Sequence, residues 1–136
     1  KAPPPVGKLS ILQHLVASYK LWHEYMPHIP KTSRYTLGEK IDACFIETLE
    51  LLFFAQYAKK EQRLPTLQKA NVKFDSLKFF LQLLWETNGI SAKQYANISK
   101  HLVDIGKMLG GWLRRVEAET AQGLKAHTQS SARTKE

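Results

Sequence analysis

The sequence predicts an all-α protein, an antiparallel, up-down-up-down four-helix bundle. Apolar residues recur at intervals of three and four from Leu9 to near Val116, and no segment alternates apolar and polar residues as a half-buried strand does. Prolines and glycines interrupt this pattern at three places and leave four periodic segments. Because the connectors are short, consecutive helices are expected to run antiparallel.

The composition is that of a single globular domain. The chain has 136 residues, of which 43% are hydrophobic and 24% charged, so it can bury one core and is not a low-complexity fibre. Residues 1–7 are expected to form an N-terminal tail and residues 8–119 the bundle. Residues 120–136 are expected to be a disordered polar tail, since large apolar residues nearly disappear after Glu119.

The first two helices are bounded by prolines and by a capping pattern. The first is expected over Lys8–Met26 and ends at Pro27 and Pro30. Its apolar face consists of Leu12, Leu15, Val16, Tyr19, Trp22 and Met26. After a connector over residues 31–35, Thr36 and Glu39 have the spacing of a capping box, which predicts a second helix from Thr36 to about Lys60.

The last two helices are separated by a turn signal. A break over residues 63–66 precedes a third helix that ends at Asn88-Gly89. Its predicted core stripe is Leu67, Ala70, Phe74, Leu77, Leu81 and Leu84. Ser91 and Gln94 predict a second capping box, with Ile90 and Tyr95 spaced as a hydrophobic staple. The fourth helix carries Tyr95, Ile98, Leu102, Ile105, Leu109, Trp112 and Val116 on one stripe.

The second and third helices have more apolar surface than one bundle needs. The core stripe of the second is Leu37, Ile41, Cys44, Phe45, Thr48, Leu52 and Ala55. Further apolar residues on both helices lie away from the core stripes, and these are Ile46, Leu49, Phe53, Tyr57, Val72, Phe79, Phe80 and Leu83. Such faces favour a homo-oligomer that covers them, and the alternative is a monomer with scattered exposed aromatics.

The charge of the chain is positive and segregated. The formal net charge is +8 and the isoelectric point about 9.6, which favours an anionic partner. The fourth helix has cations at intervals of seven, flanked by Arg115, and this row is Lys93, Lys100, Lys107 and Arg114. Such a row can bind along a phosphate backbone. The alternative interpretation is that these cations form only the solvent-exposed face of a bundle helix. Smaller cationic clusters are Lys59, Lys60 and Arg63, and Lys69, Lys73 and Lys78.

The sequence gives no pattern for catalysis, metal binding or a cofactor. There is no Glu-x-x-His pair, and the five histidines do not have zinc-ligand spacing. Cys44 lies on a core stripe and is expected to be a small buried hydrophobe. Gly110-Gly111 lies within a helical repeat and is interpreted as a packing position. A single cysteine, no apolar run of about 18 residues and no signal peptide favour a cytoplasmic protein without a membrane span.

Several short motifs resemble those of one protein family. Residues 33–38, Ser-Arg-Tyr-Thr-Leu-Gly, open the second helix, and residues 67–71, Leu-Gln-Lys-Ala-Asn, open the third. Gln94-Tyr95 and residues 104–112, Asp-Ile-Gly-Lys-Met-Leu-Gly-Gly-Trp, are the most specific. Over residues 8–117 the chain resembles the accessory variability determinant proteins of diversity-generating retroelements, which are partners of a bacterial reverse transcriptase. Proteins encoded in intervening sequences of ribosomal RNA genes are related.

The resemblance implies a function and an assembly. It implies a pentameric barrel that binds a reverse transcriptase and template RNA, or an RNA–DNA hybrid, during mutagenic copying into a target gene. Nucleic-acid binding is then expected at Lys78, Lys93, Lys100, Lys107, Arg114 and Arg115. Two arginines frequent in the family correspond to Lys78 and Gln82 here, which weakens the expectation for the third helix.

Two other functions are compatible with the sequence. One is an oligomeric protein-interaction scaffold of the ribosomal intervening-sequence type, without a role in nucleic-acid binding. The other is an enzyme whose site forms between subunits, which would require acids or histidines to converge across the interface.

Overall fold

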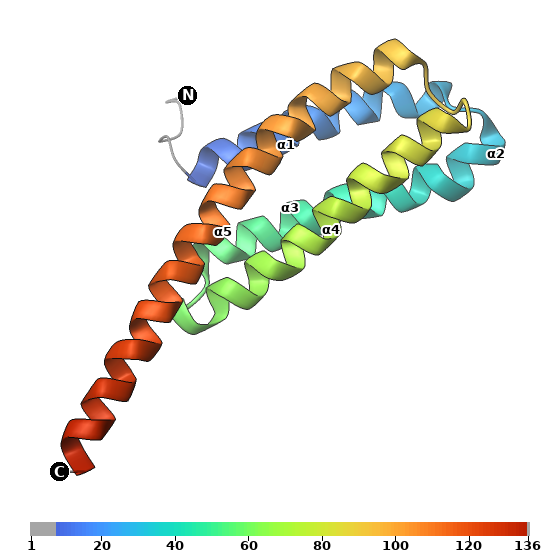
Figure 1. The fold of residues 1–136 in the computed structure, drawn as a ribbon. Coiled ribbons are helices and arrows are strands. Elements are labelled where there is room, and N and C mark those ends of the chain that lie inside the picture. The colour runs from blue at the N-terminus through green and yellow to red at the C-terminus, as the bar shows by residue number, and fades with distance from the viewer. Residues whose placement is uncertain (1–7, 136) are drawn as a thin grey trace.

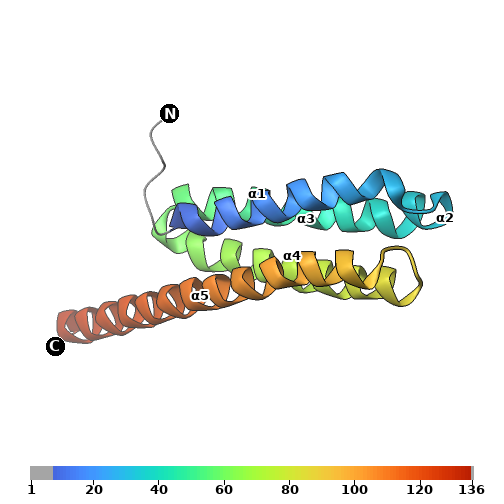
Figure 2. The same cartoon turned by 90° about the horizontal axis from the view of Figure 1, so that it is seen from above.

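The structure is a computed structural model that describes the backbone of residues 8–135 and the side chains of residues 11–129. The predicted tail over residues 1–7 lies outside the described residues. Four long helices form a bundle, and they are α1 (Lys8–Tyr25), α3 (Glu39–Tyr57), α4 (Lys60–Glu86) and α5 (Ala92–Lys135). The described part of the chain contains no strand. The colour gradient shows that each long helix runs antiparallel to the preceding one (Figure 1), and α5 projects far beyond the bundle (Figure 2).

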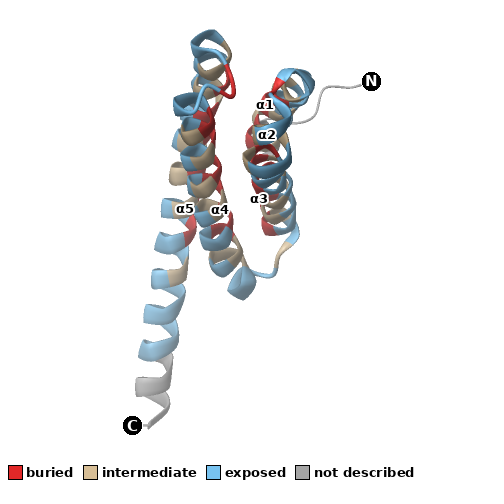
Figure 3. Ribbon diagram, turned by 90° about the vertical axis from the view of Figure 1, so that its right-hand side faces the viewer, coloured by how far each residue is buried: buried red, intermediate tan, exposed pale blue. Residues whose placement is uncertain are grey.

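The core consists of one stripe from each long helix, which lies toward the interior of the bundle (Figure 3). All six predicted stripe residues of α4 are buried, as are six of the seven predicted on α3, Leu37 being only partly covered. On α1 the stripe is rotated from the prediction, because Ile11 and Ser18 are buried while Val16 is exposed. The predicted periodicity therefore identifies the core of α3, α4 and α5 better than that of α1.

Aromatic packing joins α1 to α3. Trp22 stacks on Phe45 with ring centroids 6.2 Å apart, and Tyr19 meets the same ring edge-on at 5.6 Å. The indole Nε1 of Trp22 donates a hydrogen bond of 3.2 Å to Asp42 Oδ1. Trp22 and Phe45 are fully buried, so this cluster combines apolar burial with a satisfied polar group.

The predicted capping box at Thr36 is wrong. Helical structure already begins at Lys31, with α2 (Lys31–Ser33) followed by a π-helical stretch over Arg34–Gly38 that continues into α3. Thr36 therefore lies inside a helical run, where its hydroxyl donates to the carbonyl of Thr32 at 2.9 Å instead of capping an end. The helix starts earlier because Pro30 has the extended conformation of a residue that precedes a helix.

The Arg34 side chain secures the turn before α3. Its guanidinium donates hydrogen bonds to the carbonyls of Pro27, at 2.6 Å, and Ile29, at 2.8 and 3.1 Å. Pro27 lies within the 3-10 turn Met26–His28 that follows α1, and Ile29 comes directly after this turn. Only a planar side chain with several donors can satisfy both carbonyls in this way, so Arg34 has a structural role in the Ser33–Gly38 motif.

The predicted break over residues 63–66 is also wrong. Lys59 has extended backbone dihedrals, and α4 begins at Lys60 with Pro65 inside it. A proline in the second turn removes one intrahelical hydrogen bond donor, and Pro65 is exposed. Thr66 Oγ1 donates to the carbonyl of Gln62 at 2.8 Å in the same turn. The destabilising effect of Pro65 is therefore local. At its N-terminus α4 is almost two turns longer than the sequence predicts.

The α4–α5 turn agrees with the sequence prediction. Asn88 has a left-handed φ of 64°. Gly89 N donates to the carbonyl of Leu84 at 2.8 Å and Asn88 N to that of Trp85 at 3.0 Å, which is a Schellman motif. The predicted capping box is confirmed, because Ser91 N donates to Gln94 Oε1 at 3.0 Å and Gln94 N donates to Ser91 Oγ at 3.1 Å.

The C-terminal segment differs from its prediction. Instead of becoming disordered after Glu119, the chain continues as helix α5 to Lys135. No proline follows Glu119, and Ala, Gln, Lys and Glu are strong helix formers, so propensity extends the helix where the apolar repeat ends. The side chains of residues 121–129 are exposed, so this extension makes no core contact in the single chain.

The turn supplies a test of the packing. A Cβ atom at Gly89 would lie 2.2 Å from Leu84 Cδ1, whereas a Cβ at Gly123 would meet nothing within 4 Å. Gly89→Ala should therefore reduce the free energy of unfolding by about 1–3 kcal/mol, because Leu84 is fully buried and must shift. Chemical denaturation followed by circular dichroism measures this. Gly123→Ala is the matched control and should not destabilise the protein; equal effects of the two substitutions would contradict the geometry.

Candidate nucleic-acid interface and contact surfaces

The basic row on α5 is exposed along its whole length. Lys93, Lys100, Lys107 and Arg114 all point away from the buried stripe, and Arg115 beside them is exposed too. Seven residues rotate an α-helix by 20° less than two full turns, so successive cations lie almost above one another along the helix axis. From Lys93 to Arg114 the row spans roughly 31 Å. In the described part of the chain none of these five residues has a carboxylate partner within 4 Å. Their charges are available to a ligand.

The row is longer than the period of seven predicts. Lys125 lies eleven residues after Arg114 and is exposed on the helical extension. Eleven residues rotate an α-helix by 20° more than three full turns, so Lys125 lies on the same side of α5 as Arg114. The sequence does not reveal Lys125 as part of the row, because the loss of large apolar residues after Glu119 predicts a disordered tail there.

The paired glycines of α5 accommodate arginine side chains. A Cβ at Gly110 would lie 3.4 Å from Arg114 Nη1, and one at Gly111 would lie 3.6 Å from Arg115 Nη1. Among the described residues, no atom of a neighbouring helix lies within 4 Å of either added Cβ, so the glycines do not serve a close helix approach within the chain. Instead, the missing side chains leave space for the guanidinium groups of Arg114 and Arg115, which extend along the helix toward its N-terminus. At Gly106, by contrast, an added Cβ would lie 3.5 Å from the ring of Phe74 on α4.

Lys78 is not part of this row. It lies on α4, where its Nζ is 3.3 Å from Asp75 Oδ1 and 5.0 Å from the centroid of the Phe74 ring. It lines a hollow between α4 and α5 together with Tyr95 and Val103. The structure thus places Lys78 on a different helix from the other five predicted residues and compensates part of its charge.

The other cationic clusters are partly used within the fold. Lys73 Nζ lies 2.7 Å from Glu47 Oε2, and this ion pair joins α4 to α3 and raises the pKa of Lys73. Arg63 Nη2 donates to the carbonyl of Ala58 at 3.1 Å, close to the end of α3. The row on α5 is therefore the more accessible cationic surface.

The predicted second apolar faces lie on the surface of the single chain. Val72 is 62% exposed, Phe79 is 61% exposed and Tyr57 is 73% exposed. Ile46 and Phe53 are about half exposed, while Leu49, Phe80 and Leu83 are partly covered. Phe54, which is not among the predicted apolar-face residues, is also exposed and contacts Phe53 at 5.9 Å between ring centroids.

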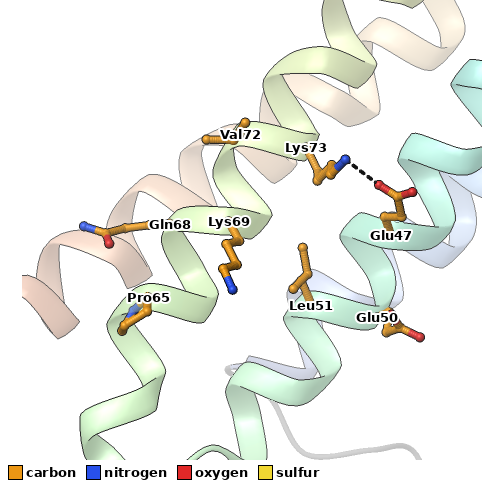
Figure 4. A pocket seen from close by; sticks show the side chains of 8 residues that line it. All are labelled: Glu47, Glu50, Leu51, Pro65, Gln68, Lys69, Val72 and Lys73. Atoms are coloured by element: carbon orange, nitrogen blue, oxygen red, sulfur yellow. Dashed lines mark ion pairs between the residues drawn. The ribbon is translucent and has the colours of Figure 1, made fainter.

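These apolar residues surround distinct hollows. Figure 4 shows the groove between α3 and α4, of about 600 Å³, with Val72 and Leu51 on opposite sides and the Lys73–Glu47 ion pair at one end. Ile46 lines a second hollow beside Met26 and Tyr35, and Phe79 lines the hollow between α4 and α5. The exposed apolar surface is thus distributed around the bundle.

Metal-ligand clusters and membrane-spanning helices are absent from the described residues. No group of three or more His, Cys, Asp or Glu residues there could hold a metal ion. None of the described helices is both long enough and apolar enough to cross a membrane. Cys44 is buried on the core stripe, as the sequence predicted.

The fold and its surfaces define a class of protein, a helical bundle with an exposed row of cations on its last helix. The chain belongs to the bAvd-like family, which matches residues 10–116. This membership confirms the resemblance to the accessory variability determinant proteins.

A solved structure shares the fold. It is a protein of unknown function from the S23 ribosomal protein family of Bacteroides thetaiotaomicron, with a TM-score of 0.70 and 16% sequence identity. The similarity covers 79% of this chain and 97% of the other, so nearly all of that protein corresponds to the bundle. No curated protein matches the chain.

The environment of Cys44 gives a test of the core. Burial raises the pKa of the Cys44 thiol above its usual value, so the folded chain holds this proton more tightly than the unfolded chain. The contribution of this group to stability is therefore complete at neutral pH and decreases as the pH rises past about 8.5, where the unfolded thiol ionises. At pH 8 a disulfide reagent should modify native Cys44 at least about 100-fold more slowly than the denatured chain. Equal rates would show that the thiol is accessible.

Proposed function

We propose that the protein is a non-catalytic accessory subunit of a diversity-generating retroelement. In this role it binds a reverse transcriptase and template RNA, or its RNA–DNA hybrid, and supports mutagenic synthesis of complementary DNA. Membership in the bAvd-like family supports the class of the protein. The observation that carries the nucleic-acid role is the unpaired row Lys93, Lys100, Lys107 and Arg114, with Arg115 beside it.

The row favours recognition of the phosphate backbone. Lysines at intervals of about 10 Å act as point charges, and binding would release counterions from the nucleic acid. Contacts of this kind position a strand but carry no direct information about its sequence. The proposed binding through the row is therefore strong at low salt and independent of base identity.

The assembly that we propose is a homo-oligomeric ring, most simply the pentamer implied by the family resemblance. Exposed apolar residues occur beside separate hollows, with Ile46 beside one and Phe79 beside another. A contact between two copies that covers both hollows joins two different surfaces of the chain. Repeated head-to-tail contacts of this kind form a closed ring when the rotation from one copy to the next adds up to a full turn. Residues 37–58 have one cation and four carboxylates, whereas residues 59–82 have six cations and two carboxylates. This segregation supports a contact between α3 of one copy and α4 of the next.

The competing function is an oligomeric protein-interaction scaffold without a role in nucleic-acid binding. It is supported by the fold shared with the S23 ribosomal protein family member. The two functions differ in what the α5 row does, since a scaffold would use these cations only for solvation. Binding of RNA as a function of salt therefore separates them.

The first test concerns the row. Replacing Lys100, Lys107 and Arg114 by Ala should weaken binding to single-stranded RNA and reduce the slope of log K against log salt by about 2, since each phosphate contact contributes roughly 0.7. Fluorescence anisotropy of a labelled RNA at several salt concentrations measures both effects. The matched control replaces the exposed Lys20, Lys31 and Lys40 by Ala, which removes the same charge from other helices. A slope that falls equally in both variants would refute the assignment.

The second test concerns assembly. Light scattering at micromolar concentration should give a multiple of the 15.6 kDa chain mass. Substituting Phe53→Glu and Val72→Glu together should lower this mass towards that of one chain with helicity retained, because both side chains are exposed in the single chain. Leu124→Glu, at another exposed apolar residue, should leave the mass unchanged. A wild-type protein that is monomeric would overturn the proposed ring.

A further inference from the structure

We propose a nucleobase-binding site at the end of the bundle where α4 turns into α5. The proposal rests on the proposed nucleic-acid function and names the ligand more closely, as an unpaired base of a single-stranded segment. The site is a hollow of about 570 Å³ with a tryptophan, Trp85, in its wall. His28 and Pro30, from the segment after α1, close the other side of the hollow.

Trp85 is held as a rigid aromatic surface. Its ring lies parallel to that of Tyr95, with centroids 4.8 Å apart and an angle of 3° between the planes. Tyr95 lines the separate hollow between α4 and α5, whereas Trp85 lines the terminal one. The stacked pair thus supports Trp85 from one side. Trp85 is 37% exposed, while Trp22 and Trp112 are buried, so it is the tryptophan that a ligand can reach.

Polar groups next to Trp85 can recognise the edge of a base. In the capping box, Gln94 Oε1 accepts a hydrogen bond from Ser91 N, while Gln94 Nε2 has no partner within the described residues. The side chain of Asn88 is exposed, and the Schellman motif fixes its backbone at the rim. Amide side chains and an aromatic face are the combination with which proteins bind splayed bases of single-stranded RNA.

The hollow adjoins the start of the basic row. Ala92 and Gln94 both line it, and Lys93, the first cation of the row, lies between them in the sequence. A strand whose phosphates follow the row therefore reaches the hollow at its end. In this arrangement the row supplies affinity from charge, and Trp85 adds stacking that a duplex, with its bases paired and stacked internally, cannot use.

The test uses the emission of Trp85 in the full chain. Titration with an unlabelled 12-nucleotide single-stranded RNA should quench tryptophan emission, because the exposed indole stacks on a base while the other two indoles stay buried. The Trp85→Phe variant should lose the quench but bind the RNA with an affinity within about threefold of the wild-type value, since phenylalanine also stacks on bases. Trp85→Ala should weaken binding of the single strand about 5- to 100-fold and leave the salt slope and the binding of duplex RNA unchanged.

The control is His23→Ala, which removes an exposed aromatic ring on α1 that does not line this hollow and should leave affinity unchanged. Wild-type binding with the expected salt slope but without a quench would overturn the base site and leave the proposed function intact. The base site would also be overturned if Trp85→Ala weakened the binding of duplex RNA as much as the binding of single-stranded RNA. If the wild-type protein binds no RNA at low salt, the proposed function fails, and the base site fails with it.

Discussion

Each long helix can turn only one stripe of side chains into the bundle, and this constraint decides where every other residue lies. On α5 the stripe that includes Ile98, Ile105 and Leu109 is buried, so residues spaced by seven on the opposite side remain exposed over the full length of the helix. The basic row follows directly from this geometry. On α3 and α4 the same constraint leaves Phe53 and Phe79 outside, since the interior has no room for a second apolar face.

The sequence predicts those features that depend on neighbours along the chain. The stripe of α4, the capping box of Ser91 and Gln94 and the turn at Asn88 are all local patterns, and all three are confirmed. The same reasoning fails at Thr36, because Thr36 and Glu39 match the capping pattern but lie within helical structure that starts at Lys31. It fails at Pro65 because a proline in an early, exposed turn costs one hydrogen bond and does not end the helix.

The candidate site is only partly visible in the sequence. The period of seven in the row is a sequence pattern, and the exposure of Lys93, Lys100, Lys107 and Arg114 agrees with it. The pairing of Lys78 with Asp75 depends on rotamers, and the stacking of Trp85 on Tyr95 depends on the turn that brings α4 and α5 together. Lys78 and Trp85 directly follow the core residues Leu77 and Leu84 in the sequence and form no pattern of their own. Only the three-dimensional arrangement therefore distinguishes them from ordinary surface cations and aromatics.

Assembly and nucleic-acid binding are coupled if both proposals hold. Each copy carries a net charge of +8, so a ring concentrates cations and repels itself. A bound polyanion removes that repulsion and therefore stabilises the ring relative to free copies. Linkage requires the converse, namely that ring formation raises the affinity for the polyanion by the same factor. The apolar faces of α3 and α4 and the row on α5 are then parts of one equilibrium, although they lie on different surfaces of the chain.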